Sequence, residues 1–371
     1  MKKIKWGIKL ELLLLVATAC VFLVREMRAN RQENTISMQE ENSEASGDDK
    51  KAGDENREAI EVSSDGDFIK WVDFNVTSEV MGKAYELDVE SYKDEIHVDW
   101  IELIAYVGAR HGGRFDKKSV SEIEETARKL RAGETTMEEL TKDMEYYDYY
   151  KEAYGAVLGG MVGEFSIEVK ADDDGGKEWK DYYGLKAFSP IAKGFEYSHY
   201  DDFGSSRSYG YKRLHLGHDM MGQIGTPIIA IESGYVEALG WNQYGGWRIG
   251  IRSFDGKRYY YYAHMRQNFP YNKELKEGSI VTAGDVIGYM GHTGYSTTEN
   301  VNNIETVHLH WGLELIFDES QKESNNEIWI DCYELTKFLY RNRSETSKNQ
   351  ETKEWSRIYD MVDPAVEEFE N

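Results

Sequence analysis

The residues best suited to chemistry lie between His199 and His310, a stretch that holds seven of the nine histidines of the chain. It contains a His-Leu-Gly-His-Asp segment, then a Tyr-Ala-His segment, and ends in a His-Leu-His segment. Imidazole and carboxylate groups are typical zinc ligands, although they do not exclude other divalent metals. Three such ligands with one open position can activate a water molecule for hydrolysis. The pattern therefore predicts a hydrolytic metal centre.

The spacing of these residues allows their side chains to meet. His308 and His310 are two residues apart on a predicted strand, so both side chains leave the same face. His264 ends a neighbouring strand of alternating tyrosines. His215 and Asp219 are four residues apart around a glycine, which suits a turn that folds both toward one point. Two histidines beyond a three-ligand set would remain for proton transfer.

The elements that must position these residues are strands. Short runs such as 228–231, 247–252 and 286–290 are rich in β-branched and aromatic residues and are separated by glycine turns. An Asp255-Gly256 pair is typical of a hairpin. Residues 185–317 are therefore predicted to form an antiparallel all-β domain. Residues 318–371 are predicted to be a helical extension, with helical spacing from Trp329 to Tyr340 and a loosely attached final stretch.

Residues 66–165 show helical periodicity instead, and we expect a small all-α domain. One helix is predicted near 98–110, ending at Gly112. Two more are predicted to begin at capping-box patterns, Ser119 with Glu122 and Thr136 with Glu139, the second running as one long helix toward Gly155. Residues 170–183 are acidic and glycine-containing, which indicates a linker or a hairpin tip. The role of 66–165 is left open between inhibition, glycan binding and contact with an envelope protein.

The N-terminus has the pattern of a membrane-targeting segment. Four lysines precede an apolar run from Leu12 to Val24, and Arg25 follows. We expect residues 1–28 to be a basic flank and an uncleaved signal-anchor helix, because the apolar run continues past the alternative cleavage site at Ala17-Thr18-Ala19. Residues 29–65 contain no aromatic residue and are expected to be a disordered acidic linker. The predicted location is the cell membrane, single-pass, with the later domains outside the cell.

Overall composition excludes some classes of protein. A net charge of −24 offers no basic surplus to neutralise phosphates, so nucleic acid is not an expected partner. Hydrophobic residues make up 40% of the chain, which is enough to build folded cores. Two cysteines, Cys20 and Cys332, make no disulfide framework. The expected class is thus an α+β multidomain protein with a membrane helix, a small helical domain and an antiparallel β domain.

The histidine-containing stretch resembles the M23 peptidases, the lysostaphin-like zinc endopeptidases of bacterial cell walls. The resemblance rests on several motifs in order, from the first histidine segment through Gly291-His292-Thr293-Gly294 to the last, and covers about 185–317. It implies one Zn²⁺ ion and peptidoglycan peptides as substrate. It also implies residue roles, with His215, Asp219 and His310 as metal ligands and His264 and His308 as catalytic histidines whose individual roles are not assigned.

The same resemblance leaves three points open. Tyr209 and Tyr211, which precede the first ligand, are candidate oxyanion helpers or groove-wall residues. Glu314 shares the strand face of His310 and is a candidate to support the ligands, or an ordinary strand residue. Residues 297–307 are an insertion relative to many M23 relatives, and such a loop would either reshape the groove rim or cover it.

Two functions are consistent with the sequence. The first is a membrane-anchored zinc endopeptidase that cuts stem peptides or cross-bridges of peptidoglycan. The alternative is a catalytically silent M23-like scaffold or activator, for example in sporulation or division, that binds peptidoglycan or a partner protein. The presence of all five ligand and catalytic positions favours the enzyme.

Overall fold

The computed structural model describes residues 68–171, 175–208, 212–322 and 326–370. Across these ranges, none of the helices combines the length and the apolar character needed to span a bilayer. The predicted signal-anchor segment 1–28 and the predicted linker 29–65 lie outside the described residues, as do the side chains of Tyr209 and Tyr211.

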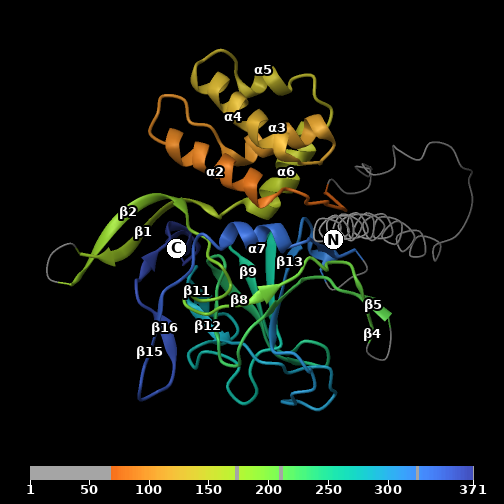
Figure 1. Cartoon of the computed structure of the whole chain (residues 1–371), viewed down its shortest axis with the longest axis vertical. Helices are drawn as coiled ribbons and strands as arrows, with labels where there is room; N and C mark the ends of the chain where they lie inside the picture. The colour runs from red at the N-terminus through yellow and green to blue at the C-terminus, as the bar shows by residue number, and fades with distance from the viewer. Residues whose placement is uncertain (1–67, 172–174, 209–211, 323–325, 371) are drawn as a thin grey trace, which may run out of the picture. The chain divides into compact units, whose positions relative to one another are not determined.

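Helices dominate the first part of the described chain (Figure 1). They are α2 (Ser78–Ser91), α3 (Trp100–His111), α4 (Lys117–Arg131), α5 (Met137–Thr141) and α6 (Tyr147–Leu158). The helix predicted near 98–110 is confirmed as α3. Asp99 caps its start by accepting from the backbone N–H of Glu102, and Gly112 ends it in the left-handed conformation.

Two details of the helical prediction are wrong. The cap of α4 is Asp116, paired with Ser119, so the helix begins earlier than the predicted Ser119–Glu122 box. The long helix predicted from Thr136 is interrupted between α5 and α6, although Thr136 does cap α5 as expected. The chain turns there because α6 packs closely on α3: a Cβ at Gly108 would lie 2.9 Å from the Tyr154 ring. Tertiary packing thus overrides the local helical periodicity.

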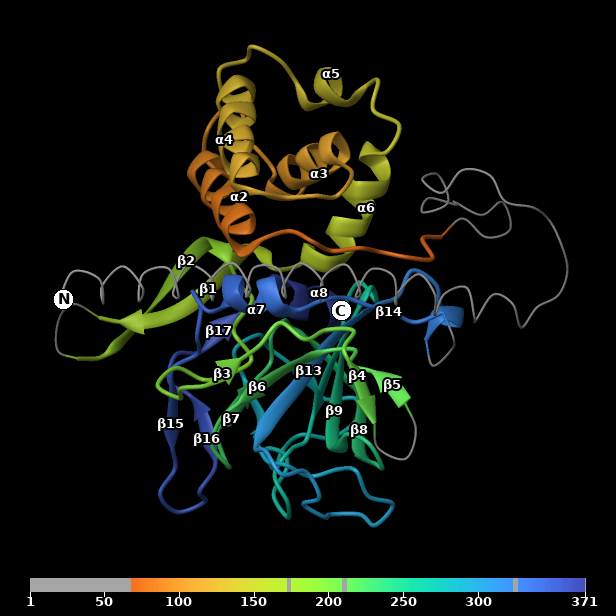
Figure 2. The same cartoon turned by 45° about the vertical axis from the view of Figure 1, so that its right-hand side comes forward.

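A sheet of eight strands follows, and all of its neighbouring strands run antiparallel, as predicted (Figures 1 and 2). Its order is β11-β8-β9-β10-β13-β6-β3, with β14 paired to β13. The strands are β3 (Ser198–His199), β6 (His218–Met221), β8 (Gly234–Asn242), β9 (Gly246–Ser253), β10 (Arg258–Ala263), β11 (Ile280–Val281), β13 (His308–Leu315) and β14 (Ile328–Trp329). The central position of β13 between β10 and β6 brings distant parts of the sequence together.

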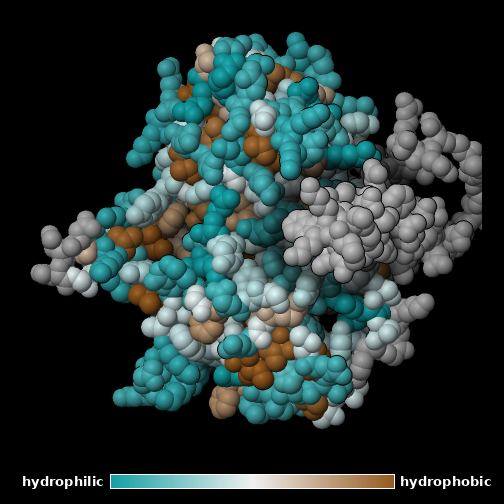
Figure 3. All heavy atoms as spheres, viewed as in Figure 1, coloured by the Kyte–Doolittle hydropathy of each residue, from teal (hydrophilic) through white to brown (hydrophobic). Residues whose placement is uncertain are grey.

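Shorter elements surround this sheet. Strands β7 (Pro227–Ile229) and β12 (Val286–Tyr289) form a separate antiparallel pair, and one side of it shares the sheet's core through Ile228 and Ile287. Strands β1 (Val162–Lys170) and β2 (Lys177–Leu185) pair along their whole length, so the described residues on both sides of the predicted hairpin tip are antiparallel partners. The face of the molecule drawn in Figure 3 is mostly hydrophilic, as the high content of charged residues leads one to expect.

The C-terminal stretch is tied into the fold, so the expectation of a loosely attached tail is wrong. Strand β17 (Met361–Val362) pairs with β1, and Met361 belongs to a small buried cluster with Phe188 and Tyr289. Phe369 of α8 (Pro364–Glu370) stacks on Phe254 with ring centroids 4.6 Å apart. Sequence alone did not indicate the pairing of β17 with β1 or the stacking of Phe369 on Phe254, because in both cases the partners lie more than a hundred residues apart. The intervening elements are η1 (Glu319–Gln321), α7 (Tyr333–Leu339), β15 (Thr346–Lys348) and β16 (Trp355–Arg357).

The helices and the sheet share one hydrophobic core and a buried ion pair. Arg258 of β10 donates two hydrogen bonds to Glu232, at 2.7 and 3.0 Å, and a third of 3.0 Å to the carbonyl of Ala156 near the end of α6. Glycine is required next to this pair, since a Cβ at Gly160 would lie 2.1 Å from the Glu232 carboxylate. The end of α6 is therefore fixed to the sheet.

Strands β4 (Ser206–Ser208) and β5 (Lys212–Leu214) form a separate antiparallel pair. Its base is closed by two backbone hydrogen bonds, from Gly204 N–H to the His215 carbonyl and from His215 N–H to the Ser205 carbonyl. His215, the first residue of the histidine pattern, directly follows β5.

Candidate metal centre

The register between β13 and β6 places two predicted ligands side by side. His310 and Asp219 are direct cross-strand partners, and His310 Nδ1 lies 2.9 Å from Asp219 Oδ1. His308 points to the same face of β13, as its two-residue spacing predicted, and its Nε2 is 3.7 Å from the same carboxylate oxygen. Two histidines from one strand thus surround one carboxylate.

His215 completes a group of three. One ligand atom from each of His215, Asp219 and His310 lies within 4.8 Å of the others. Two imidazoles and one carboxylate are a typical donor set for a zinc site that keeps an open position, so these residues fit one Zn²⁺ ion. Glycine between the ligands is required by close approach, because a Cβ at Gly217 would lie 2.5 Å from the His310 ring.

His264 lies beside this group, just after β10, and its orientation is tightly determined. Its backbone has a φ of 61°, which is uncommon for a residue other than glycine. Its Nδ1 is 2.9 Å from the carbonyl oxygen of Thr293. Because a carbonyl only accepts hydrogen bonds, this nitrogen carries the proton and Nε2 is left as the proton acceptor. Burial, and then the nearby His308 and His310, hold the pKa of His264 well below its usual value.

His308 is held in the same way. Its Nδ1 donates a 2.8 Å hydrogen bond to the carbonyl of Thr306, so its Nε2 is also a proton acceptor. The rings of His264 and His308 have centroids 4.7 Å apart, and His264 is 5.9 Å from the His310 ring. The structure therefore brings all five sequence-predicted metal and catalytic positions together. It does so with two histidines whose Nε2 atoms are available to handle protons.

Comparison with known proteins identifies this region. The model of peptidase family M23 matches residues 213–326. The chain contains a peptidase family M23 domain.

Curated relatives match over the same part of the chain. The L-Ala–D-Glu endopeptidase of Bacillus subtilis is 38% identical over 130 residues, which cover 35% of this chain and 38% of that protein. Lysostaphin of Staphylococcus staphylolyticus is 41% identical over 90 residues, covering 24% of this chain and 18% of that protein. The chain therefore spans less than two fifths of the length of either relative.

Among solved structures, one assigned to a glycyl-glycine endopeptidase of Ruminococcus gnavus has 24% identity and a TM-score of 0.49. That match covers 74% of this chain and 91% of the other.

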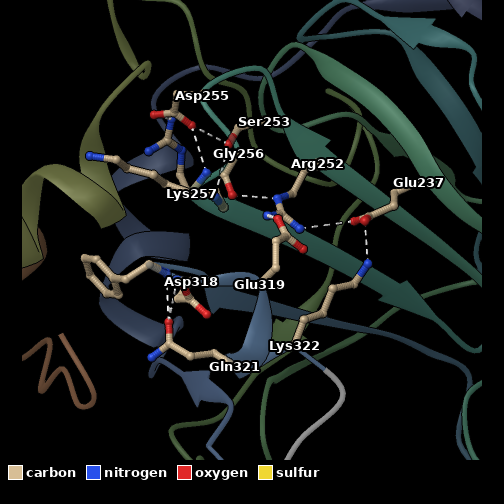
Figure 4. A network of polar contacts seen from close by, with 12 residues as sticks. Glu237, Arg252, Ser253, Asp255, Gly256, Lys257, Asp318, Glu319, Gln321 and Lys322 are labelled. Atoms are coloured by element: carbon tan, nitrogen blue, oxygen red, sulfur yellow. Dashed lines mark hydrogen bonds and ion pairs between the residues drawn. The ribbon is translucent and has the colours of Figure 1, made fainter. Parts of the chain in front are cut away.

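Glu314 does not support the ligands of the M23 domain. It lies four residues beyond His310 on β13, roughly 13 Å along the strand, opposite Tyr259 and Trp329. Its nearest charges include Lys322 and Arg252, and burial raises the pKa of its carboxyl to about 8. Figure 4 shows the ion-pair network around Arg252 in this part of the sheet, where Arg252 contacts Glu237 and Glu319 and Lys322 contacts Glu237. Glu314 is thus a buried acid distant from the metal ligands.

The two remaining histidines of the M23 domain make hydrogen bonds away from the candidate ligands. His218 is buried on the opposite face of β6 from Asp219, and its Nε2 is 2.8 Å from His199 Nδ1. His292 Nδ1 donates a 2.7 Å hydrogen bond to the carbonyl of Ile304.

Two features of the site escaped sequence reasoning. The Tyr295 ring lies 5.9 Å from that of His264, in a backbone with φ of 48°. The carbonyls of Thr293 and Thr306 fix the catalytic histidines. Every residue has a backbone oxygen, so the residue types in the sequence cannot show which carbonyl will orient a histidine. Only Gly291 and Gly294, on either side of Thr293, indicated a tightly packed turn.

Proposed function

We propose that this chain is a zinc-dependent endopeptidase that hydrolyses peptide bonds in bacterial peptidoglycan, in a stem peptide or a cross-bridge. The observation that carries the proposal is the convergence of His215, Asp219 and His310 beside two histidines with available Nε2 atoms. The M23 match adds support, as do two relatives named as an endopeptidase and as lysostaphin.

The position of each residue in the site determines whether it would bind the metal or transfer protons. A zinc ion held by His215, Asp219 and His310 would supply Lewis acidity toward a water molecule and the scissile carbonyl. In their neutral forms, His264 and His308 each present Nε2 as a proton acceptor, because Nδ1 is hydrogen-bonded to a backbone carbonyl. One ring can accept the proton of the attacking water, and a ring that has gained a proton can donate it to the leaving amine. A protonated ring can also donate a hydrogen bond to the oxyanion as charge develops there.

The proposal is tested with the full-length protein. Zinc content is measured by elemental analysis, and purified peptidoglycan digests are analysed by mass spectrometry to identify the bond cut. Asp219→Ala should abolish both zinc binding and cleavage. His111→Ala, which removes an exposed histidine of α3, should change neither. A wild-type protein that binds zinc yet releases no peptide fragment from any peptidoglycan would contradict the enzyme and favour the scaffold.

We further propose that the chain is a single-pass membrane protein anchored through residues 1–28, with 29–65 as a tether and the later domains outside the cell. The support is the sequence pattern of lysines followed by an apolar run. Cell fractionation of the full chain should place it with membranes, and added protease should reach the M23 domain in intact cells without a wall. Recovery of the protein in the soluble fraction would overturn this attachment.

A further inference from the structure

The segment that contains most of the inserted loop 297–307 is bounded by the two residues whose carbonyls orient the catalytic histidines. Thr293, just before the loop, accepts the Nδ1 hydrogen bond of His264 at 2.9 Å. Thr306, at the end of the loop, accepts that of His308 at 2.8 Å. One segment of chain, 293–306, therefore sets the ring orientation of both histidines, and any shift of this segment is passed to both rings.

Asn300 fastens the middle of this segment to the rest of the site. Its Oδ1 accepts hydrogen bonds of 2.9 Å from the Trp247 indole and from the backbone N–H of Asn268. Its Nδ2 donates a 2.7 Å bond to Asn268 Oδ1, and its carbonyl accepts one of 2.7 Å from the Gln267 side chain. Gln267 and Asn268 lie three and four residues after His264. Asn300 thus joins the loop to the segment that carries a catalytic histidine.

The backbone of Asn300 also suits this role. Its φ is 62°, in the left-handed region that asparagine tolerates better than most residues. Elsewhere the segment is closed by paired contacts between His292 and Ile304, and by a hydrogen bond from Gly294 N–H to the Val301 carbonyl. Gly291 links both histidines directly: its N–H donates to the His264 carbonyl, and its carbonyl accepts from His308 N–H.

We propose that residues 293–306 act as a brace that fixes the ring orientations of His264 and His308 through the hydrogen bonds at their Nδ1 atoms, and that Asn300 is the positioning residue that keeps this brace in place. The insertion serves to orient the catalytic histidines. The idea rests on the proposed peptidase function, since only a reaction that uses both Nε2 atoms needs them held. It does not involve the metal ligands, none of which contacts Asn300 through a described hydrogen bond.

Three variants separate the side-chain bonds from other effects. Asn300→Gly keeps the left-handed backbone accessible but removes every side-chain bond. Asn300→Asp keeps the acceptor for Trp247 and Asn268 and loses only the Nδ2 donor. The control is Thr298→Ala in the same loop, because the Thr298 hydroxyl makes no hydrogen bond within the described part of the chain. Zinc content is measured for each variant and is expected to equal that of wild type.

Two readouts decide the outcome. Because a misplacement of about 1 Å costs roughly a hundredfold in rate, Asn300→Gly should lower kcat at least about tenfold with little change in KM. The kcat of Asn300→Asp should lie between those of Asn300→Gly and wild type, and the kcat of Thr298→Ala should equal that of wild type. Independently of activity, imidazole ¹H–¹⁵N spectra should show Nδ1-protonated His264 and His308 in the wild type and mixed forms in Asn300→Gly.

The spectra keep this inference separate from the proposed activity. If the wild type cleaves nothing but its histidine spectra change in Asn300→Gly alone, the brace stands and the peptidase proposal fails. Unchanged His264 and His308 signals in Asn300→Gly would overturn the brace, and so would equal losses of kcat in Asn300→Gly and Thr298→Ala.

Discussion

At the level of single residues, His264 combines two features that suit a proton acceptor. Its Nδ1 donates to a backbone carbonyl, which leaves Nε2 available, and burial lowers its pKa. The ring is therefore neutral around pH 7 and can take a proton from water. The Nδ1 of its neighbour His308 is likewise hydrogen-bonded to a backbone carbonyl, so this ring is oriented in the same way and can carry out the complementary step.

Replacing His264 tests this role without touching a metal ligand. Because general acid–base groups contribute about 10²–10⁴-fold to rate, His264→Ala should lower kcat by that order while zinc content stays at the wild-type level. Peptide-release kinetics and elemental analysis of the same preparations provide the check. His111→Ala is the matched control. Full activity in His264→Ala, or loss of its zinc, would contradict the assignment.

The buried environment of Glu314 leads to a testable prediction about how protein stability depends on pH. Its side chain is buried, and its Oε1 has no hydrogen-bond partner among the described residues. Burial raises its pKa from 4.5 to about 8. Between these two values the folded state holds a proton that the unfolded chain releases, so stability falls as pH rises through this window. The slope is up to about 1.4 kcal/mol per pH unit.

Glu314→Gln should remove this penalty, because an amide has no proton to lose. The free energy of unfolding of the variant, relative to wild type, should rise by about 1–4 kcal/mol between pH 5 and pH 8.5. Urea unfolding curves at the two pH values measure it. Glu178→Gln, which replaces an exposed carboxylate, is the control. Its stability difference from wild type should be the same at both pH values. A constant difference between Glu314→Gln and wild type would mean that the carboxyl is already ionised in the folded state.

At the level of elements, the junction between α6 and the sheet depends on Arg258. Its guanidinium is fully buried between Glu232, Asp255 and the carbonyl of Ala156. Removing one partner of a buried ion pair leaves the other charge without compensation. Arg258→Met should therefore lower the free energy of unfolding by about 3–5 kcal/mol, as measured by urea unfolding. Arg128→Met on the surface of α4 should have little effect, and a similar loss in both variants would contradict the argument.

A double variant separates burial from pairing at this junction. In Arg258→Met with Glu232→Gln, the buried carboxylate of the pair is replaced by a neutral amide, and only the half-exposed Asp255 has lost its partner. Part of the lost stability should therefore return. If the double variant is as unstable as the single one, the loss arises from packing around the side chain.

Sequence predicted those elements whose cause is local. The two-residue spacing of His308 and His310 was enough to place both rings on one face of β13. It could not reveal the break between α5 and α6, which the fit of Tyr154 beneath Gly108 determines. The pairing of Ser166 with Val362 was equally hidden, because that pair is almost two hundred residues apart. The same holds for the candidate site. Its side chains could be predicted from the sequence, whereas the backbone carbonyls that orient them could not.

At the level of the whole molecule, the candidate ligands come from three elements, and His310 lies 91 residues after Asp219 in the sequence. His215 directly follows β5, Asp219 lies on β6, and His310 lies on β13. A metal ion that binds all three connects these segments in the folded state and has no equivalent site in the unfolded chain. Its binding energy is therefore added to the stability of the fold.

Removal of the metal should therefore lower the stability of the fold and, at the same time, abolish peptide hydrolysis. At a free zinc concentration of about a thousand times Kd, binding contributes roughly 4 kcal/mol, so a chelator should lower Tm by several degrees and abolish peptide release. Added zinc should restore both. Asp219→Ala should have the lower Tm without any chelator, and the chelator should not change it further.

Acidification should weaken zinc binding, because His215 and His310 must be unprotonated at their ligand atoms. A Tm that is indifferent to the chelator in the wild type would show that no tightly bound metal links these segments.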